Sequence, residues 1–588
     1  MVLAKETTIS SVLSGGHQLR IPRYQRHYEW KKEHWDQLWK DVVRLALERR
    51  DDPGESHFLG SVVLAAPPGA GQGLLVIDGQ QRIVTVSLLL CALRDGEVTL
   101  PAAQRARIHR CLLLDEGDRR LSRFKRLRVL PSQFDQAEYS VIVERGGHAP
   151  TGQVTRAYEH FRSLVADLSR DPSEAATDDE DVVDEAGAEV PTATPTELVR
   201  AIVRGLECVN ITAQAEDNVH RIFESLNNTG TPLTQSDLIR NYVFARLDEK
   251  DSDFYDAWWL PLEQRFPDSV EFTQLFWLDL LLDGHAVPQR QTYMYQQRVM
   301  KNLTRAQIKA RIEGIYSRGD LWDTILHPDH DPSGKIGHRL QRLKDWKTTT
   351  VWPVLMYLLE QRRSGLATID HVERAMGYLE SYFVRRVVIG KATMNMNRVL
   401  MAAPARLAED PRRVDVALRS YLSGEGKHWA SDDELRALAT TKGFYNHGRA
   451  HQKRLILRWI EEGLRDNEDV LRPDLTIEHV MPQQRTAAWN AELRRGALPG
   501  ETPKALHEEL VHTLGNLTLT VRNTEMSNKS FREKMDLLNS KYGTGMQLTA
   551  DFRYLQHWGP EQIRGRSLVM VERIISFWPG PVPPESQP

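Results

Sequence analysis

The chain has 588 residues, too many for one compact core, so its length predicts roughly two to four domains. Hydrophobic residues make up 41% and charged residues 27%, as in ordinary globular proteins, and the net charge of -3 excludes a strongly basic protein. The three cysteines, Cys91, Cys111 and Cys208, lie far apart, which argues against a disulfide framework or a zinc-thiolate site and favours a reducing compartment.

The start of the sequence, MVLAKETTISSVLSGG, lacks the charged and then apolar plan of a signal peptide. No apolar run approaches the roughly 18 residues that a membrane span needs. Together these observations predict a cytoplasmic protein without membrane contact.

Cationic, amide and aromatic side chains gather in IPRYQRHYEW, residues 21–30. This mixture suits a phosphate with a base or a sugar beside it. A polar and aromatic entry to the following helix, EHWDQLWKDVV, is an equally good interpretation of the stretch alone. The candidate contact residues are Pro22, Tyr24, Gln25, Arg26, Tyr28 and Trp30.

LLVIDGQQRIVTVSLLLCAL, residues 74–93, predicts a strand that turns at Asp78-Gly79 into a long apolar helix, with Asp78 as the cap. Gln80, Gln81 and Arg82 then lie in the first helical turn, where free backbone N–H groups favour an anion. Arg82 adds a bidentate donor for a phosphate. The alternative is that Arg82 pairs with Asp78 and only fastens the turn.

Two charged stretches follow. RRLSRFKRLR, residues 119–128, has six basic residues in ten and either tracks phosphates or is a solvated basic face. Residues 173–189 are acidic without a basic residue, and with EVPTATPTE they predict a disordered loop over about 171–197. This loop interrupts the first domain, because ELVRAIVRGLECVNI returns to the periodicity of a helix.

RIFESLNNTGTPLTQSDLIRNYVF, residues 221–244, predicts a helix, a polar turn and a second helix. Thr234 and Asp237 have the spacing of a capping box, which leaves Asn227, Asn228 and Thr229 on an exposed turn. Alone, this turn is generic.

In this order, the patterns P-x-Y-Q-R-x-Y-x-W, D-G-Q-Q-R and F-E-x-L-N-N-x-G-x-P-L-x-x-x-D-L-I-R-N resemble the N-terminal domain of the GmrSD family of modification-dependent restriction proteins, over about residues 8–245. The resemblance implies a fold similar to ParB and sulfiredoxin. It also implies hydrolysis of GTP or ATP, with Asp78, Gln81 and Arg82 as catalytic residues. The nucleotide would be bound by residues 78–82 with Asn227 and Asn228, and modified DNA would be sensed through residues 22–30.

From about 250 to 430 the sequence is rich in Trp, Leu, Arg and Glu at helical spacing and predicts a helical region. From 431 onward, RLILRWIEEGL predicts a helix, LTIEHVMP and LGNLTLT predict short strands, and SFREKMDLLNS predicts a helix. These elements predict an α+β multidomain protein with the domains 1–248, 249–430 and 431–588.

The two short strands carry residues suited to phosphodiester hydrolysis. His479 could take a proton from water, Asn516 could hold its ring, and Glu478 with Asn523 could ligate a hard cation through oxygens. A single histidine on an apolar strand is more often structural, but the neighbouring carboxylate and the asparagine-rich partner strand favour the functional interpretation.

The pattern E-H-x-x-P, followed by L-G-N-L-T-L-T and S-N-x-x-F-x-x-K, resembles the C-terminal HNH nuclease domain of the same family over about 430–575. The resemblance implies a ββα-metal core with His479 as the general base and Asn516 as the middle residue. It implies Asn523 as the third residue and metal ligand, with Asn528 as a competitor, and a DNA contact by Lys534. The implied metal is Mg²⁺ or Mn²⁺.

The leading hypothesis is a cytoplasmic antiphage endonuclease that nicks or cuts double-stranded DNA and senses a modification such as phosphorothioate or a modified base. The alternative is a modification-sensing NTPase that regulates a partner nuclease, with a degenerate HNH part. Proteins of a DNA-modification system and a homo-oligomer are the predicted partners. The sequence leaves open the modification, its sign and the nucleotide.

Overall fold

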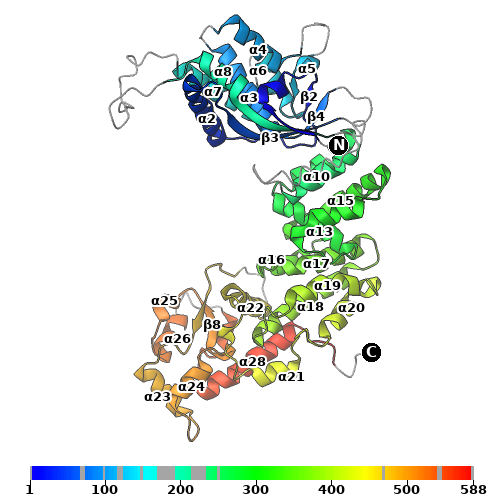
Figure 1. Cartoon of the computed structure of the whole chain (residues 1–588). Coiled ribbons are helices and arrows are strands. Elements are labelled where there is room, and N and C mark those ends of the chain that lie inside the picture. Colours follow the sequence, from blue (N-terminus) through cyan, green and yellow to red (C-terminus); the bar gives the residue numbers. More distant parts are fainter. Residues whose placement is uncertain are drawn as a thin grey trace, which may run out of the picture. The chain divides into compact units, whose positions relative to one another are not determined.

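The computed structural model describes residues 3–66, 73–96, 100–114, 123–145, 150–168, 192–213, 234–247, 252–465, 471–539 and 546–583. The chain divides into two compact units, Met1–Ser269 with Gln297–Lys309, and Val270–Gln296 with Ala310–Pro588. The predicted mixed, mostly helical α+β class is confirmed (Figure 1). The three-domain division stays a prediction. None of the described helices is both long and apolar enough to span a membrane.

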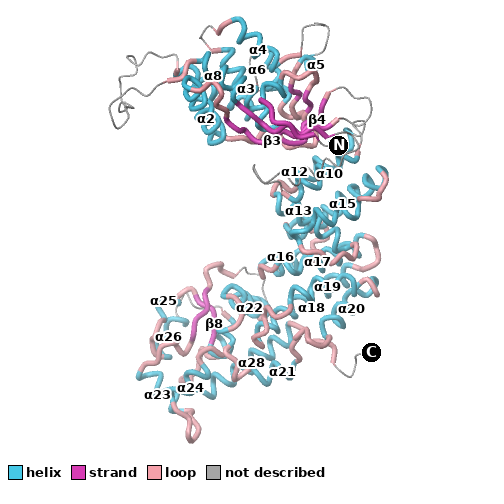
Figure 2. The backbone as a smooth tube through the Cα atoms, in the orientation of Figure 1, coloured by secondary structure: helices cyan, strands magenta, loops and turns pink. Residues whose placement is uncertain are grey.

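The first unit contains a six-stranded mixed sheet, shown in magenta in Figure 2, with the order β1-β6-β3-β4-β2-β5. β3 pairs parallel with β6 and antiparallel with β4, while β2 pairs parallel with both β4 and β5. The strands are β1 Leu3–Thr8, β2 Leu19–Arg20, β3 His57–Ala65, β4 Leu74–Asp78, β5 Val129–Leu130 and β6 Leu206–Ala213.

Most helices of this unit lie over one face of the sheet (Figure 2), where they bury a large apolar core. The central helix α3 is buried along nearly its whole length, because its sequence IVTVSLLLCAL is apolar all round. The helices are α1 Ile9–Leu13, α2 Lys32–Asp51, α3 Gln80–Asp95, α4 Ala102–Leu112, α5 Arg123–Arg126, α6 Gln136–Glu144, α7 Gln153–Asp167, α8 Pro195–Gly205, α10 Gln235–Arg246, α11 Ser252–Phe254 and α12 Leu260–Arg265, with a π-helical turn at Tyr255–Trp259.

The structure corrects two predictions for this unit. ELVRAIVRGLECVNI is a helix only as far as Gly205 and then forms β6, in which the buried Cys208 and Ile211 are three residues apart and point to opposite faces of the sheet. The loop predicted over about 171–197 ends earlier, because the capping box of Thr194 and Glu197 starts α8 at Pro195. Residues 169–191 lie outside the described residues.

The described end of the basic stretch is structural. Arg128 is 5% exposed and donates hydrogen bonds to the carbonyls of Arg110 and His17 at 3.3 Å. Arg126 forms a 2.8 Å ion pair with Glu144. Neither side chain is therefore free to track phosphates.

The predicted helical region between the sheet and the C-terminal part is confirmed. It consists of α13 Ser269–Leu282, α14 Thr292–Met300, α15 Arg305–Leu326, α16 Gly337–Asp345, α17 Trp352–Arg363, α18 Ile369–Val388, α19 Met396–Leu407 and α20 Val414–Ser423. Trp259 and Trp346 lie in the core, as predicted.

The C-terminal part carries a two-stranded antiparallel sheet among helices. β7 Thr476–His479 pairs with β8 Leu517–Thr520, and both strands and the following helix agree with the prediction. The helices are α21 Asp432–Leu438, α22 Ala450–Gly463, α23 Ala487–Arg495, α24 Pro503–Leu510, α25 Asn523–Met526, α26 Phe531–Asn539, α27 Gln547–Ala550 and α28 Pro560–Phe577.

Candidate active site

Two adjacent residues at the end of β7 carry the predicted chemistry. Glu478 lies opposite Thr518 and His479 lies opposite Leu517 in the β7-β8 register. Successive residues of a strand point to opposite faces, so the carboxylate and the imidazole enter different surroundings. Both are almost fully buried, at 4% and 5% exposure.

The His479 ring lies among aromatic and basic side chains. Its Nε2 is 3.2 Å from Nδ1 of His512, and its Nδ1 is 3.5 Å from Nε2 of the exposed Gln483. Tyr445 packs edge-on against His479 at 4.4 Å and stacks on His512 at 5.6 Å. The Lys453 ammonium lies 4.4 Å from the centre of the Tyr445 ring.

These contacts assign the tautomer of His479. An amide N–H can only donate, so Nδ1 of His479 accepts from Gln483. The proton of the neutral ring is then on Nε2, which donates to Nδ1 of His512. The basic nitrogen of His479 therefore faces the exposed Gln483.

Burial, together with the cationic forms of His512, Lys534, Lys453 and His507, lowers the pKa of His479 to about 3. Burial also lowers the pKa of His512. The pair is thus neutral at physiological pH, and His479 is available as a proton acceptor.

Asn516 is completely buried and holds the chain that follows His479. Its Oδ1 accepts from the Met481 backbone N–H at 2.7 Å, and its Nδ2 donates to the Met481 carbonyl at 2.8 Å. Nδ2 also donates to the carbonyl of Val511, and Trp558 Nε1 donates to Oδ1. Asn516 therefore positions the backbone after His479, whereas the sequence led us to expect it on the imidazole ring.

Gly515 precedes Asn516 because helix α28 comes too close for a side chain. A Cβ there would lie 2.2 Å from the Ile563 carbonyl oxygen and 2.4 Å from Ser567 Oγ. Ser567 also accepts the Gly515 N–H at 3.1 Å. Glycine in this 3-10 turn before β8 thus allows α28 to pack directly behind the site.

Glu478 forms a buried ion pair with Lys534 of α26. Lys534 Nζ lies 2.5 Å from Glu478 Oε1 and donates to the His479 carbonyl at 2.7 Å. Burial raises the pKa of Glu478 and lowers that of Lys534, and the attraction within the pair opposes both shifts. The Lys534 side chain is 0% exposed, so the predicted DNA contact by Lys534 is wrong.

The two candidate asparagines occupy different surroundings. Asn523 begins α25 and donates from Nδ2 to the Ile477 carbonyl of β7 at 2.9 Å, which leaves its Oδ1 as an acceptor beside that strand. Asn528 is exposed and donates to Oε1 of Gln484 at 3.0 Å. Of the two, Asn523 is the one bonded to the strand of Glu478 and His479.

In the first unit, the predicted strand-turn-helix over 74–93 is confirmed, but its cap differs from the prediction. The residue before α3 is Gly79, in the left-handed region at φ 88°. No side chain caps the helix, so Asp78 is not the N-cap. Arg82 NH1 donates to the Ser61 carbonyl at 2.8 Å and lies 4.0 Å from Asp78 Oδ2. A Cβ on Gly60, at φ 111°, would lie 3.0 Å from Arg82 Cζ, so glycine admits the guanidinium.

The 78–82 turn and the 21–30 stretch lie in contact. Gln81 Oε1 accepts the N–H of Glu29 at 2.9 Å, and Gln81 Nε2 donates to the His27 carbonyl at 3.1 Å. Gln80 Nε2 donates to the Arg26 carbonyl at 3.4 Å. Both glutamines therefore hold the backbone of the aromatic stretch.

Two of the six candidate DNA contacts are buried inside this junction. Gln25 is 6% exposed and donates to the Ile77 carbonyl at 2.9 Å. Tyr28 is 2% exposed, contacts Thr85 Oγ1 at 2.6 Å and accepts from Trp35 Nε1 at 2.9 Å. These side chains fasten the stretch to the core.

The other members of the stretch differ in accessibility. Pro22 is buried, whereas Arg26, Tyr24 and Trp30 are partly exposed. Tyr24 stacks on Phe244 of α10 at 5.6 Å. Of the six candidate DNA contacts, these three partly exposed residues are therefore the ones whose side chains DNA can reach.

Asn227 and Asn228 lie outside the described residues, so their place in the site stays a prediction. The capping box that follows them is confirmed, with Asp237 N–H donating to Thr234 Oγ1 at 3.1 Å and Thr234 N–H donating to Asp237 Oδ2 at 3.1 Å.

Two family models match the chain in the order of its two candidate sites. GmrSD restriction endonuclease, N-terminal domain, matches residues 9–244, and GmrSD restriction endonucleases, C-terminal domain, matches residues 429–573. The chain belongs to the GmrSD family of restriction endonucleases. The predicted resemblance is thereby confirmed, and membership of this family implies a restriction endonuclease that acts on DNA. No curated protein matches it.

Sequence reasoning missed three residues around the GmrSD C-terminal centre: His512, Tyr445 and Gln483. His512 lies only four residues before Asn516, and this proximity to the L-G-N run was the available signal. Tyr445 lies in a separate 3-10 turn, Phe444–Asn446, and its backbone N–H donates to the His512 carbonyl at 3.0 Å. No local pattern indicates that contact.

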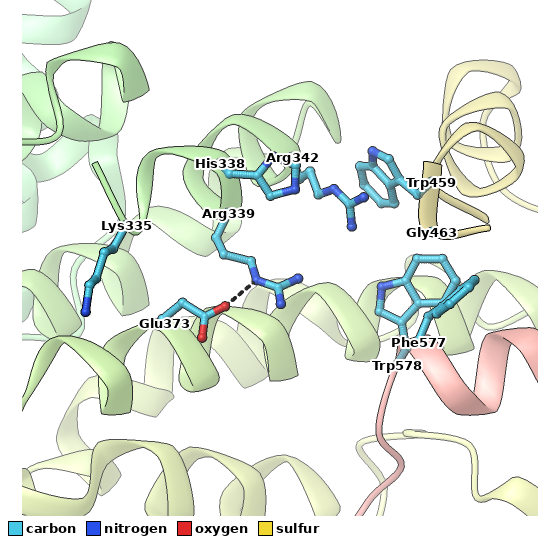
Figure 3. A pocket seen from close by; sticks show the side chains of 9 residues that line it. All are labelled: Lys335, His338, Arg339, Arg342, Glu373, Trp459, Gly463, Phe577 and Trp578. Atoms are coloured by element: carbon cyan, nitrogen blue, oxygen red, sulfur yellow. Dashed lines mark hydrogen bonds and ion pairs between the residues drawn. The ribbon is translucent and has the colours of Figure 1, made fainter. Parts of the chain in front are cut away.

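A cavity of about 290 Å³ elsewhere in the second unit is lined by cationic and aromatic side chains (Figure 3). Its Arg339 is bonded to Glu373 at 2.9 Å, and its Arg342 to Glu380 at 2.7 Å. Because its arginines are already paired with carboxylates, this cavity is a weak candidate for an anion site.

Proposed function

We propose that this GmrSD chain cleaves double-stranded DNA at the β7-β8 centre, with His479 as the general base. The observation that carries the proposal is the neutral, buried His479 whose Nδ1 faces the exposed Gln483. A general base must be unprotonated and within hydrogen-bond reach of water. Displacement of the Gln483 amide would place a water on that nitrogen.

His512 is proposed as the positioning residue for this step. Its Nδ1 accepts a hydrogen bond from Nε2 of His479, which fixes the ring orientation. The same bond stabilises the imidazolium that forms when Nδ1 of His479 takes a proton from water. Asn516 supports the same geometry by holding Met481.

We propose that Mg²⁺ or Mn²⁺ would be held by oxygens of Glu478 and Asn523, with Asn528 as the alternative to Asn523. Carboxylate and amide oxygens are the ligands that such hard cations prefer, and Asn523 keeps Oδ1 for this role. When bound, the ion would supply a Lewis acid for the phosphate. To bind the ion, the Glu478 carboxylate must first release the Lys534 ammonium with which it is paired, and this requirement can be tested.

Removal of divalent cations is expected to stop cleavage. With Mg²⁺, the wild-type chain should convert supercoiled plasmid to nicked or linear DNA, and excess EDTA should reduce conversion to background. The same plasmid prepared with and without phosphorothioate or modified bases reveals whether modification activates or restrains cutting. Cleavage that persists in EDTA would contradict a metal-dependent centre.

We propose that the first unit binds a nucleoside triphosphate at residues 78–82 and senses DNA modification through Tyr24, Arg26 and Trp30. Gln80 Oε1 supports a ligand site, because it is buried without a hydrogen-bond partner among the described residues. Such an orphaned acceptor costs about 1 to 3 kcal/mol, and a ribose hydroxyl or a base amino group would satisfy it. A ParB-like fold and GTP or ATP as the nucleotide belong to this proposal.

Arg82→Ala is expected to lower GTP or ATP turnover by roughly tenfold to a hundredfold, because hydrogen bonds to a charged group contribute about 1.5 to 3 kcal/mol. Phosphate release by the purified chain with DNA measures the effect. Arg82→Lys, which keeps the charge near Ser61, and Arg44→Ala, at an exposed arginine of the same unit, are the controls. Equal turnover in Arg82→Ala and wild type would remove Arg82 from the proposed site.

A second candidate function is a modification-sensing NTPase that regulates a partner nuclease. The Glu478–Lys534 ion pair favours it, since the proposed metal ligand is already neutralised. This candidate predicts no DNA cleavage by the pure chain with any divalent cation, but DNA-stimulated nucleotide turnover. The plasmid assay separates the two functions directly.

A further inference from the structure

Three ligand-type side chains meet at the end of α15, away from the β7-β8 centre in sequence. Asp323 Oδ1 lies 3.0 Å from His327 Nδ1, and Asp323 Oδ2 lies 2.7 Å from His330 Nδ1. The two imidazole rings are 5.0 Å apart. Their ligand atoms all lie within 4.8 Å of one another. Two histidines and one carboxylate thus converge from eight consecutive residues.

Local structure explains the convergence. Asp323 lies in the last turn of α15 and His327 directly follows the helix end, where its N–H donates to the Asp323 carbonyl at 2.7 Å and so continues the helical spacing of the two side chains. Pro328 then starts a 3-10 turn that brings His330 back to the helix end, and the His330 N–H donates to the His327 carbonyl at 2.9 Å.

The turn is held rigidly on its far side. A Cβ on Gly337 would lie 2.7 Å from the Pro328 carbonyl, so α16 packs closely against it. Asp331 Oδ2 accepts the backbone N–H groups of Ile336 and Gly337 at 2.9 and 3.0 Å. The ligand atoms therefore belong to a fixed junction between α15 and α16.

We propose that Asp323, His327 and His330 bind one divalent transition-metal ion of the Zn²⁺ type. Zn²⁺ bonds of about 2.0 to 2.1 Å to nitrogen and oxygen place neighbouring tetrahedral ligands about 3.3 Å apart. The two observed nitrogen–oxygen separations, 3.0 Å to Oδ1 and 2.7 Å to Oδ2 of Asp323, need only small adjustments to reach this value. Ligand atoms as far as 4.8 Å apart must move closer, which rotation of the two half-exposed histidine rings allows. Imidazole and carboxylate are also the donors that borderline ions prefer, whereas Mg²⁺ prefers oxygen alone.

The proton balance is simple. A carboxylate only accepts, so both Nδ1 atoms now donate protons to Asp323. On binding, the ion takes the place of these shared protons. Each neutral ring gives its Nδ1 proton to water and takes up one on Nε2, so Nδ1 becomes a ligand without net release of a proton. The half-exposed rings, at 50% and 52%, let the ion enter from solvent, and water fills the remaining coordination positions. The ion would join the end of α15 to the turn before α16.

The test uses the full-length chain, freed of any affinity tag and of metal, and titrated with Zn²⁺. Wild type is expected to bind one more tight Zn²⁺ than His327→Gln or His330→Gln, and its melting temperature should rise with Zn²⁺ by a margin that both variants lose. With Co²⁺ as the probe, the visible absorption of a four-coordinate site should disappear in the same variants.

Two controls assign the ion. His285→Gln, at an exposed histidine of the same unit, should keep the full Zn²⁺ stoichiometry. Glu478→Gln should keep it as well, so failure of the proposed nuclease centre leaves this site unaffected. Identical stoichiometry and affinity in wild type, His327→Gln and His330→Gln would overturn the proposal. Because both rings are half-exposed, the metal-free variants are expected to melt like wild type.

Discussion

Replacing His479 by alanine is expected to lower the rate of DNA cleavage by about 10²- to 10⁴-fold, the usual contribution of a positioned general base. The substitution removes the Nδ1 acceptor that faces Gln483 and leaves His512 without its hydrogen-bond partner. Conversion of supercoiled plasmid, measured as an initial rate with Mg²⁺ in pure protein, gives the effect. Cleavage at the wild-type rate in His479→Ala would exclude this centre.

His557→Ala is the matched control, because this half-exposed histidine of the same unit has no part in the proposed chemistry, and it should cut like wild type. His512→Ala is expected to cut more slowly than wild type but faster than His479→Ala, since a positioning residue only orients the base. An order in which His512→Ala is the more damaging variant would move the base to His512.

The pH profile checks the same assignment. The pKa of His479 is lowered from 6.5 to about 3, so the folded state binds fewer protons at this ring than the unfolded state between those values. The free energy of unfolding therefore decreases as the pH falls from 6.5 towards 3. Cleavage, by contrast, should lack the fall near pH 6.5 that protonation of an ordinary histidine base would cause.

Local patterns predicted the elements that carry the two sites. An apolar run before Asp78-Gly79, and a second one before Met481-Pro482, each encode a strand and its end within a few residues. The apolar helix after Gly79 was equally legible, because α3 is buried on all sides. Such signals depend only on neighbours in the chain.

Local sequence patterns did not predict which residues pair with the site residues. Lys534 looked like a surface cation, but it lies 56 residues after Glu478 in the chain and is buried against it. Tyr28 looked like an exposed aromatic residue, but it is buried, with its hydroxyl beside Thr85 Oγ1 and accepting a hydrogen bond from Trp35 Nε1. Burial of a polar group depends on which distant group satisfies it, and a single sequence does not display that pairing.

Gly515 shows the same limit from the other direction. The structure supplies a packing reason for glycine at this position, because helix α28 occupies the space of a side chain. Lying about 50 residues further along the chain, Ser567 has no relation to Gly515 that the sequence can reveal.

Lys534→Ala is expected to destabilise the chain by about 3 to 5 kcal/mol, because it leaves the Glu478 carboxylate buried without its partner. The loss also removes the hydrogen bond from Nζ to the His479 carbonyl. Urea unfolding followed by tryptophan fluorescence measures the change. Lys529→Ala, at an exposed lysine of the same region, should change the stability by no more than about 0.5 kcal/mol.

A second substitution separates the pair from its surroundings. Adding Glu478→Gln to a Lys534→Met chain removes both charges, so the double variant should recover much of the stability lost by Lys534→Ala. The same series tests the metal proposal. In Lys534→Ala the carboxylate of Glu478 is free to bind a cation, so Mg²⁺ should stabilise this variant more than wild type and should not stabilise the double variant. If Mg²⁺ affects all three chains equally, Glu478 serves only as the partner of Lys534, and the ion is held elsewhere.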